Sequence, residues 1–277
     1  PLQDLSEKFN ILQSAMASSE RVFALLDEPE TVRDPVAPRR LARPVRGEVA
    51  FEDVWFRYPR ASAAGERPAE NGWVLKGVTF AARPGRTVAI VGHTGAGKTT
   101  IINLLLRFYD VDRGRITVDG VDIRELEQAE LRALVGLVQQ DIFLFTGDIR
   151  ANIRLDAPLP DSAVEAAARR VGATGFIERL PARFDHRLDE RGQNLSVGER
   201  QLLSFARALA VDPAILVLDE ATSSVDAQAE ERIQAAIAEL MRGRTSLVIA
   251  HRLSTVQHAD EILVLHHGRI LERGTHR

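Results

Sequence analysis

The sequence lacks cysteine, has very little lysine and contains no long hydrophobic run. With no cysteine among its 277 residues, the chain forms neither a disulfide framework nor a thiolate metal site, and a reducing compartment is its simplest location. No stretch approaches the roughly 18 to 20 consecutive apolar residues that cross a bilayer, and no charged-then-apolar secretory segment opens the chain. We therefore expect the chain as given to be soluble.

Charge is nearly balanced, which excludes one class of partner. The 36 Lys and Arg residues face 39 Asp and Glu residues, and the net charge is -3. No basic block of the kind that follows a nucleic-acid backbone occurs, so we expect no nucleic-acid partner. Only three of the 36 basic residues are lysine, so a lysine inside a motif is informative. A composition of 45% hydrophobic and 27% charged residues suits one large or two small domains with a core.

The first 46 residues differ from the rest of the chain. Apolar residues at a three-and-four spacing predict a helix over Leu5–Leu26, within a segment that we assign to residues 1–28. This helix is either a surface helix packed on a core or the cytosolic end of a longer helix that descends from a preceding domain. The start at Pro1 instead of Met and the missing N-cap favour the second interpretation, and thus a fragment of a longer protein. Residues 29–46, with four prolines and no periodicity, are predicted to be an extended linker.

Residues 47–277 alternate between strand-like and helix-like segments. A strand pair in a partly exposed antiparallel sheet is predicted over Glu48–Tyr58, and the nearly all-apolar segment Thr87–Val91 predicts a strand buried on both faces. Further strands alternate with helices, which is typical of a parallel α/β core. These predicted strands are Val74–Phe80, Ala214–Leu218, Ser246–Ala250 and Glu261–Leu265, and the predicted helices are Thr100–Phe108, Asp161–Arg170 and Gly198–Ala210.

A glycine-rich motif follows the strand Thr87–Val91. It reads Gly92-His93-Thr94-Gly95-Ala96-Gly97-Lys98-Thr99, and it matches G-x-x-x-x-G-K-[ST] between a strand and a helix. We call it the phosphate loop, because its glycines let successive backbone N–H groups and the next helix N-terminus surround phosphate oxygens. Lys98 adds a cation for the β and γ phosphates, and Thr99 offers its hydroxyl to Mg²⁺. The motif predicts a nucleoside triphosphate site.

A second apolar strand ends in two carboxylates, Asp219 and Glu220. Asp219 is placed to hold Mg²⁺, directly or through water. Glu220 is placed to polarise a water in line with the γ-phosphate, a general-base role typically worth about 10² to 10⁴ in rate. The alternative is that both acids only cap the next helix. Their combination with a phosphate loop favours Mg²⁺-dependent triphosphate hydrolysis.

The chain from about Gly47 to its C-terminus resembles the nucleotide-binding domain of ATP-binding cassette (ABC) transporters. The resemblance rests on Leu195-Ser196-Val197-Gly198-Glu199-Arg200-Gln201, which lies between the phosphate loop and the acidic strand and is similar to the family's LSGGQ. It implies a P-loop NTPase core with a mixed, mainly parallel sheet, an antiparallel β-subdomain and an inserted α-helical subdomain at about 141–210. We call Leu195–Glu199 the signature segment. In physical terms it is a helix entrance that binds a phosphate, and Ser196-x-x-Glu199 also fits a capping box.

The resemblance further implies two Mg-ATP sandwiched between two head-to-tail domains, with the signature segment on the ATP of the partner. Tyr58 resembles the aromatic that stacks on adenine, and Gln140 the glutamine that contacts Mg²⁺ and the attacking water, with Gln139 as the alternative. Asp226 resembles a residue of the dimer seam, and His251 the histidine that contacts the γ-phosphate. The implied ATP contacts are Tyr58, Gly92, His93, Thr94, Gly95, Ala96, Gly97, Lys98, Thr99, Thr100 and Gln140; the implied metal ligands are Thr99, Gln140 and Asp219; and the implied catalytic residues are Glu220 and His251.

Two segments resemble the surface through which exporters of this family receive their membrane domains. The run Phe143–Phe145 is unusually apolar for a loop, and Glu190–Gly192 precedes the signature segment. With the helix and linker of residues 1–46, they imply an exporter at the cytoplasmic face of a membrane. Its own and its partner's transmembrane domains and the transported substrate are then the remaining partners. The C-terminus at Arg277 is expected to lack the final helices usual in the family.

The signature segment departs from the family pattern at Val197, where the family has glycine, and at Glu199, where it has glutamine. Valine crowds a close backbone approach, and a carboxylate repels a triphosphate. An intact phosphate loop with a weakened signature segment is expected from one member of a heterodimeric multidrug or lipid-type exporter. A homodimer that tolerates both substitutions is the alternative.

Two other functions remain to be weighed. A soluble cassette ATPase acting on DNA or ribosomes predicts basic stripes and long arm insertions, which the net charge of -3 and the sequence do not support. A nucleotide-gated structural subunit without turnover commonly lacks the carboxylate that Glu220 supplies. ATP hydrolysis coupled to export is therefore the leading prediction.

Overall fold

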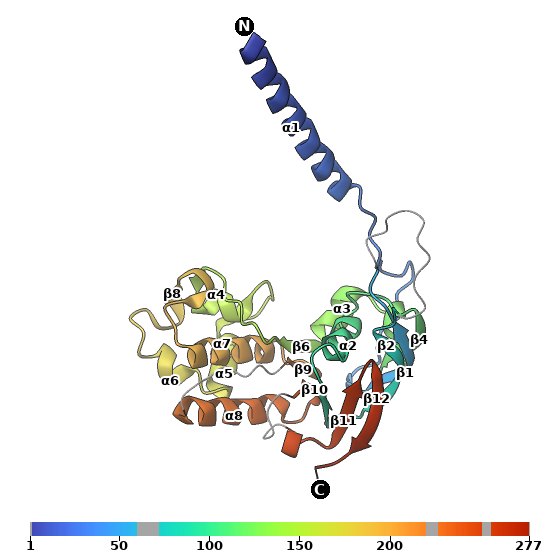
Figure 1. The fold of residues 1–277 in the computed structure, drawn as a ribbon. Helices are drawn as coiled ribbons and strands as arrows, with labels where there is room; N and C mark the ends of the chain where they lie inside the picture. The colour runs from blue at the N-terminus through green and yellow to red at the C-terminus, as the bar shows by residue number, and fades with distance from the viewer. Residues whose placement is uncertain (1, 60–71, 220–226, 251–255, 277) are drawn as a thin grey trace. The chain divides into compact units, whose positions relative to one another are not determined.

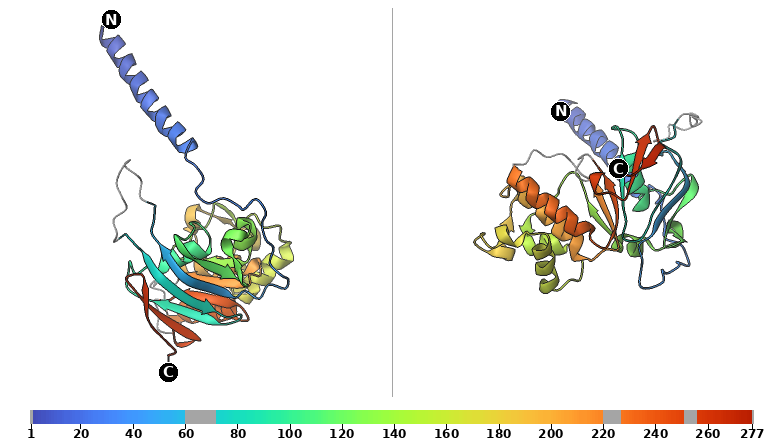
Figure 2. Two further views of the ribbon diagram at one scale, coloured as in Figure 1. Left: turned by 90° about the vertical axis from the view of Figure 1, so that its right-hand side faces the viewer. Right: turned by 90° about the horizontal axis from the view of Figure 1, so that it is seen from below.

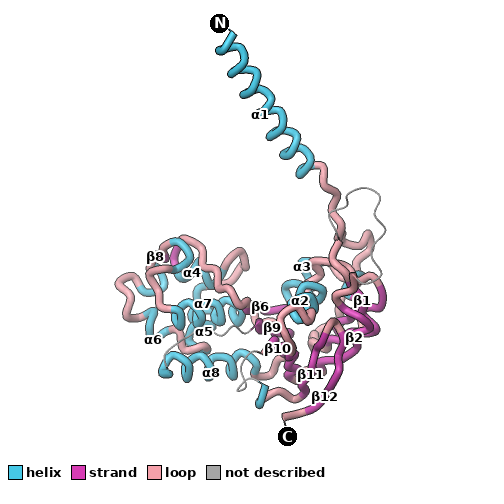
Figure 3. Tube along the Cα trace, viewed as in Figure 1, coloured by secondary structure: helices cyan, strands magenta, loops and turns pink. Residues whose placement is uncertain are grey.

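The computed structural model describes residues 2–59, 72–219, 227–250 and 256–276 (Figure 1, Figure 3). By its internal contacts the chain divides into two compact units, Pro1–Arg33 and Asp34–Arg277, and each is described by itself. Within the described residues, no helix is both long enough and apolar enough to span a lipid bilayer.

The first unit is a single helix, α1 (Leu2–Leu26), at the position that the apolar spacing predicts. The apolar side chains of that spacing lie open to solvent: Phe9 is 57% exposed, Met16 65% and Phe23 63%. The helix therefore carries an apolar stripe along its length, which is the surface that helices use to pack on a neighbour.

Residues 34–46, the second part of the predicted linker, belong to the second unit. They form no helix or strand, yet Leu41 is only 6% exposed. The Arg39 N–H donates to the Glu125 carbonyl at 2.8 Å, and the Arg46 N–H donates to Asp119 Oδ2 at 2.7 Å. This part of the segment is thus fixed on the domain that it enters.

An antiparallel sheet of four strands has the order β2-β1-β4-β5. Its strands are β1 (Val49–Phe56), β2 (Leu75–Ala82), β4 (Arg113–Val118) and β5 (Val121–Asp122). The strand pair predicted over Glu48–Tyr58 is wrong, because that segment is the single strand β1. A break in register follows Phe51, and Asp53 has a φ of 46°. This irregularity moves the buried positions from Val49 and Phe51 to Val54 and Phe56, which imitates a second strand in the sequence.

The second sheet has six strands in the order β12-β11-β3-β10-β9-β6. The strands from β11 to β6 are parallel, and β12 is an antiparallel edge strand. In chain order they are β3 (Thr87–Val91), β6 (Val135–Val138), β9 (Ile215–Asp219), β10 (Thr245–Ile249), β11 (Glu261–His266) and β12 (Arg269–Gly274). The predicted parallel core of an α/β fold is confirmed, and β3 has the bounds that the sequence predicts.

Helices cover the parallel sheet, and most of them gather beyond its β6 end (Figure 1, Figure 2). They are α2 (Lys98–Leu105), α3 (Gln128–Ala133), α4 (Ile149–Arg154), α5 (Asp161–Arg170), α6 (Thr174–Ile177), α7 (Val197–Ala210) and α8 (Ala227–Met241), and β7 (Gly147–Asp148) pairs with β8 (Arg187–Leu188) beside them. Strand β9 contributes to two cores: Leu216 and Leu218 pack with α7 and α8, while Ile215 and Val217 pack toward the antiparallel sheet. This alternation follows from the two-residue period of a strand.

Candidate functional site

The phosphate loop leaves β3 and enters α2, as the motif predicts. Gly97 caps α2 with a φ of 108°, a backbone conformation that favours glycine. A Cβ on Gly92 would lie 2.2 Å from the Leu265 carbonyl oxygen, a contact that backbone atoms cannot relieve without moving β11. Gly92 is therefore required by the close approach of β11, and Gly97 by its left-handed backbone conformation. Gly95 differs, since a Cβ there would meet nothing within 4 Å.

Lys98 is the first residue of α2 and its side chain folds back into the loop. Its Nζ donates to the Gly92 carbonyl at 2.7 Å and to the His93 carbonyl at 3.1 Å, and the residue is 7% exposed. Burial lowers the pKa of Lys98, and the nearby negative charge of Asp219 acts in the opposite direction. A cation is thus held at the centre of the loop, within electrostatic reach of the carboxylate that ends β9.

Tyr58 lies against the first turns of α2. Its hydroxyl is 3.1 Å from Thr100 Oγ1 and accepts a hydrogen bond from Asn103 Nδ2 at 3.3 Å. Its ring meets that of Tyr109 edge to face, with centroids 5.1 Å apart, and the residue is 38% exposed. The predicted adenine-stacking residue therefore sits beside the phosphate loop with an exposed part available to a ligand. Its hydroxyl and that of Thr100 are bonded to each other.

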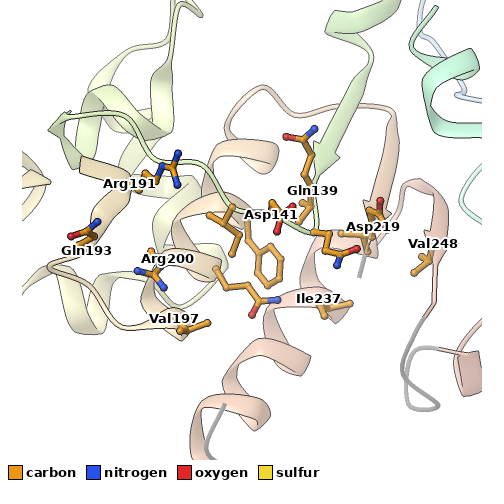
Figure 4. Close-up of a pocket in the computed structure, with 15 residues that line it drawn as sticks. Gln139, Asp141, Arg191, Gln193, Val197, Arg200, Asp219, Ile237 and Val248 are labelled. Atoms are coloured by element: carbon orange, nitrogen blue, oxygen red, sulfur yellow. The ribbon is translucent and has the colours of Figure 1, made fainter. Parts of the chain in front are cut away.

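The carboxyl ends of β9 and β6 meet the start of α7 at a cavity of about 340 Å³ (Figure 4). Asp219 comes from β9, and Gln139 and Gln140 follow β6. Since β6 and β9 are parallel neighbours, their ends lie at one edge of the sheet. The predicted metal ligands Asp219 and Gln140 thus line one cavity. Gln139 lines it as well, so the choice between the two glutamines stays open.

The signature segment forms the N-terminus of α7 and is a capping box. The Ser196 hydroxyl accepts a hydrogen bond from the Glu199 N–H, and Glu199 Oε2 accepts from both the Ser196 N–H and the Ser196 hydroxyl, each at 2.9 Å. Arg179 Nη2 lies 4.0 Å from Glu199 Oε1. The Glu199 carboxylate therefore accepts hydrogen bonds from both donors of Ser196 at the start of α7.

The two unusual residues of the signature segment face different spaces. Val197 is 38% exposed and lines the 340 Å³ cavity with Asp219. Ser196, Gly198 and Glu199 line a separate cavity of about 290 Å³, together with Arg179. Of the two substitutions, only Glu199 borders the second cavity.

Three predicted site residues, Glu220, Asp226 and His251, lie outside the described residues. The structure brings the phosphate loop, Asp219 and Gln140 to one edge of the sheet. One contact of the site has no local sequence signal: the Gly268 N–H donates to the Ala96 carbonyl at 3.0 Å. A Cβ on Gly268 would lie 2.1 Å from the Val74 carbonyl oxygen, so the turn between β11 and β12 requires glycine to close on the loop.

Comparisons with known proteins agree with this geometry. The family model described as ABC transporter matches residues 75–223, more than half of the chain. A putative ABC transporter ATP-binding protein of Streptococcus pneumoniae is 45% identical over 276 residues, which is 100% of this chain and 45% of that protein. A fatty acid ABC transporter ATP-binding/permease protein of Mycobacterium bovis is 46% identical over 278 residues, 100% of this chain and 42% of that protein.

An ATP-dependent lipid A-core flippase of Alkalilimnicola ehrlichii is 46% identical over 268 residues, 96% of this chain and 44% of that protein. Among solved structures, a bacterial Atm1-family ABC exporter with ATP bound superposes with a TM-score of 0.81 and 39% identity, over 97% of this chain and 45% of that chain. The chain thus spans less than half the length of these relatives.

Proposed function

We infer, because this chain belongs to the ABC transporter family, that it binds Mg-ATP and hydrolyses it to drive export of a substrate across a membrane. The observation that carries this proposal is the position of Lys98, whose ammonium is held inside the phosphate loop and within electrostatic reach of Asp219. A loop that cradles phosphates and a carboxylate that holds Mg²⁺ are two recurring parts of sites for phosphoryl transfer.

The donors at this edge of the sheet fit Mg²⁺ chemically. Thr99 offers a hydroxyl on the first turn of α2, Asp219 a carboxylate and Gln140 an amide oxygen. These are hard oxygen ligands, which Mg²⁺ prefers to nitrogen or sulfur. When bound, the ion would neutralise charge between the β and γ phosphates. Asp219 and Thr99 would hold it, while Lys98 leaves its loop carbonyls to contact the phosphates.

Glu220 and His251 complete the proposed chemistry from their places in the sequence. Glu220 directly follows Asp219, the last residue of β9, in the sequence. It would accept a proton from the attacking water, and His251 would hold that water and the γ-phosphate in place. Tyr58 would stack on the adenine ring beside α2.

The second half of each site would come from a partner domain. The N-terminus of α7 would face the triphosphate bound by the partner, so two ATP molecules would lie between two domains, with Asp226 at the seam. In this chain the Ser196 hydroxyl and N–H bond to Glu199, so a phosphate has to displace a carboxylate. This supports a heterodimer in which the present chain has the competent phosphate loop and the weaker signature segment. A homodimer is the alternative.

The length of the relatives supports a membrane part outside this sequence, because the chain spans 42% of a relative named as an ATP-binding/permease protein. We place the domain at the cytoplasmic face of that membrane, with the exposed Phe143 and Phe145 toward the membrane part. The relatives act on fatty acid or lipid A-core by their names. An apolar or lipid-like substrate is accordingly the class to test first.

Phosphate release from Mg-ATP tests the proposal. Wild type should hydrolyse ATP, Lys98→Ala should not bind it, and Glu220→Gln should bind it without turnover. Equal rates for wild type and Glu220→Gln would contradict the role of Glu220. The absence of ATP binding by wild type would contradict the function as a whole.

A further inference from the structure

The loop after β6 presents a pair of aromatic side chains. Leu144 is fully buried, whereas Phe143 is 48% exposed and Phe145 52% exposed, and the two rings meet edge to face with centroids 5.0 Å apart. The buried Leu144 thus lies between two phenylalanines that face solvent. Exposed aromatic residues are enriched at the centres of protein interfaces.

Asn152 of α4 fixes the backbone of this loop. The residue is 2% exposed, and its Oδ1 accepts from the Phe145 N–H at 2.8 Å while its Nδ2 donates to the Phe145 carbonyl at 2.8 Å. Nδ2 also donates to the Asp148 carbonyl at 3.0 Å. One amide side chain thus satisfies both backbone groups of Phe145.

Arg207 of α7 completes the arrangement. Its Nη1 donates to the Phe143 carbonyl at 2.9 Å, its Nε to the Asn152 carbonyl at 2.9 Å and its Nη2 to Asn152 Oδ1 at 3.3 Å. We call these two side chains the Arg207–Asn152 clamp. It holds the loop on both sides of Leu144, and it does so with the planar fork of a guanidinium, which a lysine amine cannot reproduce.

Arg207 is a cation, yet the described residues to which it donates hydrogen bonds offer only neutral oxygens and no carboxylate. Burial lowers the pKa of Arg207, because the charged form loses its hydration. Removing a charge from water costs free energy. If the side chain only filled space, an apolar side chain of similar length would do so without that cost. Its directional bonds to the loop are what an apolar residue would lose.

The clamp also joins two surfaces of the domain. Helix α7 begins at the signature segment, and Arg207 lies 11 residues after Ser196, about 16 Å along the helix axis at 1.5 Å per residue. Arg207 therefore attaches the loop of Phe143 and Phe145 to the same helix that begins at the signature segment.

We propose that Arg207 and Asn152 are positioning residues that fix Phe143 and Phe145 for docking of the membrane-spanning part of the longer protein. The proposal rests on the proposed function. The occupant is chosen because the relatives are more than twice the length of this chain, and one carries permease in its name. The two aromatic side chains supply an apolar contact for a segment of that part.

The first test measures hydrogen exchange in the chain itself. Arg207→Lys should accelerate exchange of the Phe145 amide and its neighbours in residues 143–149 at least about tenfold, while the amides of β3 and β9 keep their rates. Arg169→Lys, an exposed arginine on α5, is the matched control. Unchanged exchange at residues 143–149, or equal acceleration in β3 and β9, would overturn the clamp.

The second test measures ATP hydrolysis by the full-length protein in phosphatidylethanolamine and phosphatidylglycerol vesicles. Phe143→Ala/Phe145→Ala and Arg207→Met should each lower the rate at least about fivefold, and the triple variant should be no slower than the double variant. ATP affinity of the 277-residue chain should stay within twofold, since the phosphate loop is untouched.

The outcomes separate the two proposals. If the fold losses of hydrolysis rate from the Arg207 and phenylalanine substitutions multiply in the triple variant, Arg207 does not act through the phenylalanines. If no variant loses activity, the surface does not dock. A wild-type protein that hydrolyses no ATP would instead contradict the proposed function. The exchange experiment would still decide whether the clamp holds the loop.

Discussion

The phosphate loop and the signature segment are both helix N-termini that can face a phosphate, but they differ in what occupies them. In the phosphate loop, Lys98 bonds to the neutral carbonyls of Gly92 and His93, which carry no charge that would repel an anion. In the signature segment, the donors of Ser196 bond to the carboxylate of Glu199, which repels an incoming anion. In the proposed dimer, one chain would therefore contribute two unequal half-sites for nucleotide.

The two regions also differ in how tightly the backbone is constrained. The phosphate loop is packed so closely that a Cβ on Gly92 would clash with the Leu265 carbonyl of β11, and a Cβ on Gly97 with the Leu75 side chain of β2. The start of α7 borders two cavities, of about 340 and 290 Å³, and Val197 is 38% exposed there. The loop is therefore preorganised, whereas the signature segment has room to accept substitutions.

Glu220→Gln should give the largest effect, and it would test the half-site that contains the phosphate loop. Without a general base, turnover should fall by about 10² to 10⁴, while ATP affinity stays within a few fold. Phosphate release and equilibrium ATP binding, measured on the same preparations, check this. A variant with undiminished turnover would place the base elsewhere.

Gly92→Ala should damage the phosphate loop through packing. A Cβ 2.2 Å from the Leu265 carbonyl oxygen forces the backbone apart, so we expect a loss of about 1 to 3 kcal/mol in unfolding free energy and weaker ATP binding. Gly95→Ala is the control, because only its φ of 80° and no contact opposes a side chain. Urea unfolding should show a larger loss of unfolding free energy for Gly92→Ala than for Gly95→Ala. The reverse order would contradict the packing argument.

The double variant Val197→Gly/Glu199→Gln would test the half-site that contains the signature segment. If the weak half-site is dispensable, restoring the family residues should change turnover of the assembled transporter by less than about twofold, because the competent site receives its signature segment from the partner. Steady-state phosphate release measures this. A severalfold increase would show that this signature segment limits turnover.

Asp260→Asn should give the smallest effect and concerns the strand that leads to the phosphate loop. Burial would raise the pKa of Asp260, but hydrogen bonds from the Thr87 N–H and Arg86 hold it below its ordinary value. The carboxylate therefore stabilises the fold above about pH 3.9, and this contribution is lost as the pH falls through the lowered pKa. We expect a loss below about 1 kcal/mol at pH 7, since the side chain is 36% exposed.

Urea unfolding at several pH values checks this expectation. The difference between wild type and Asp260→Asn should narrow as the pH falls toward and below about 3.9. A difference that grows at low pH would contradict the assigned sign.

Some parts of the site could be predicted because they depend on residues that are neighbours in the sequence. The bounds of β3, the phosphate loop and the capping box at Ser196 follow from spacing, glycine content and an S-x-x-E pattern. The acidic end of β9 follows from an apolar run that stops at Asp219. Family membership followed in turn from the order of these motifs along the chain.

The remaining features depend on contacts between distant residues. The irregularity at Asp53 shifts the burial pattern of β1 by one position, which the sequence alone presents as two strands. Arg207 and Asn152 are 55 positions apart, and Gly268 reaches the Ala96 carbonyl from the turn after β11. Such pairs carry no short-range pattern, so only the folded chain reveals them. The roles of Glu220, Asp226 and His251 remain predictions.

The most direct test of unequal half-sites is the mass in solution of the Glu220→Gln chain at high concentration, with and without Mg-ATP. Removing the base should trap a nucleotide sandwich wherever the signature segment closes on a triphosphate. The account predicts a monomer that binds ATP, because Glu199 already occupies the donors of Ser196. An ATP-dependent doubling of the mass would contradict it, since this signature segment would then close on the nucleotide of a second copy.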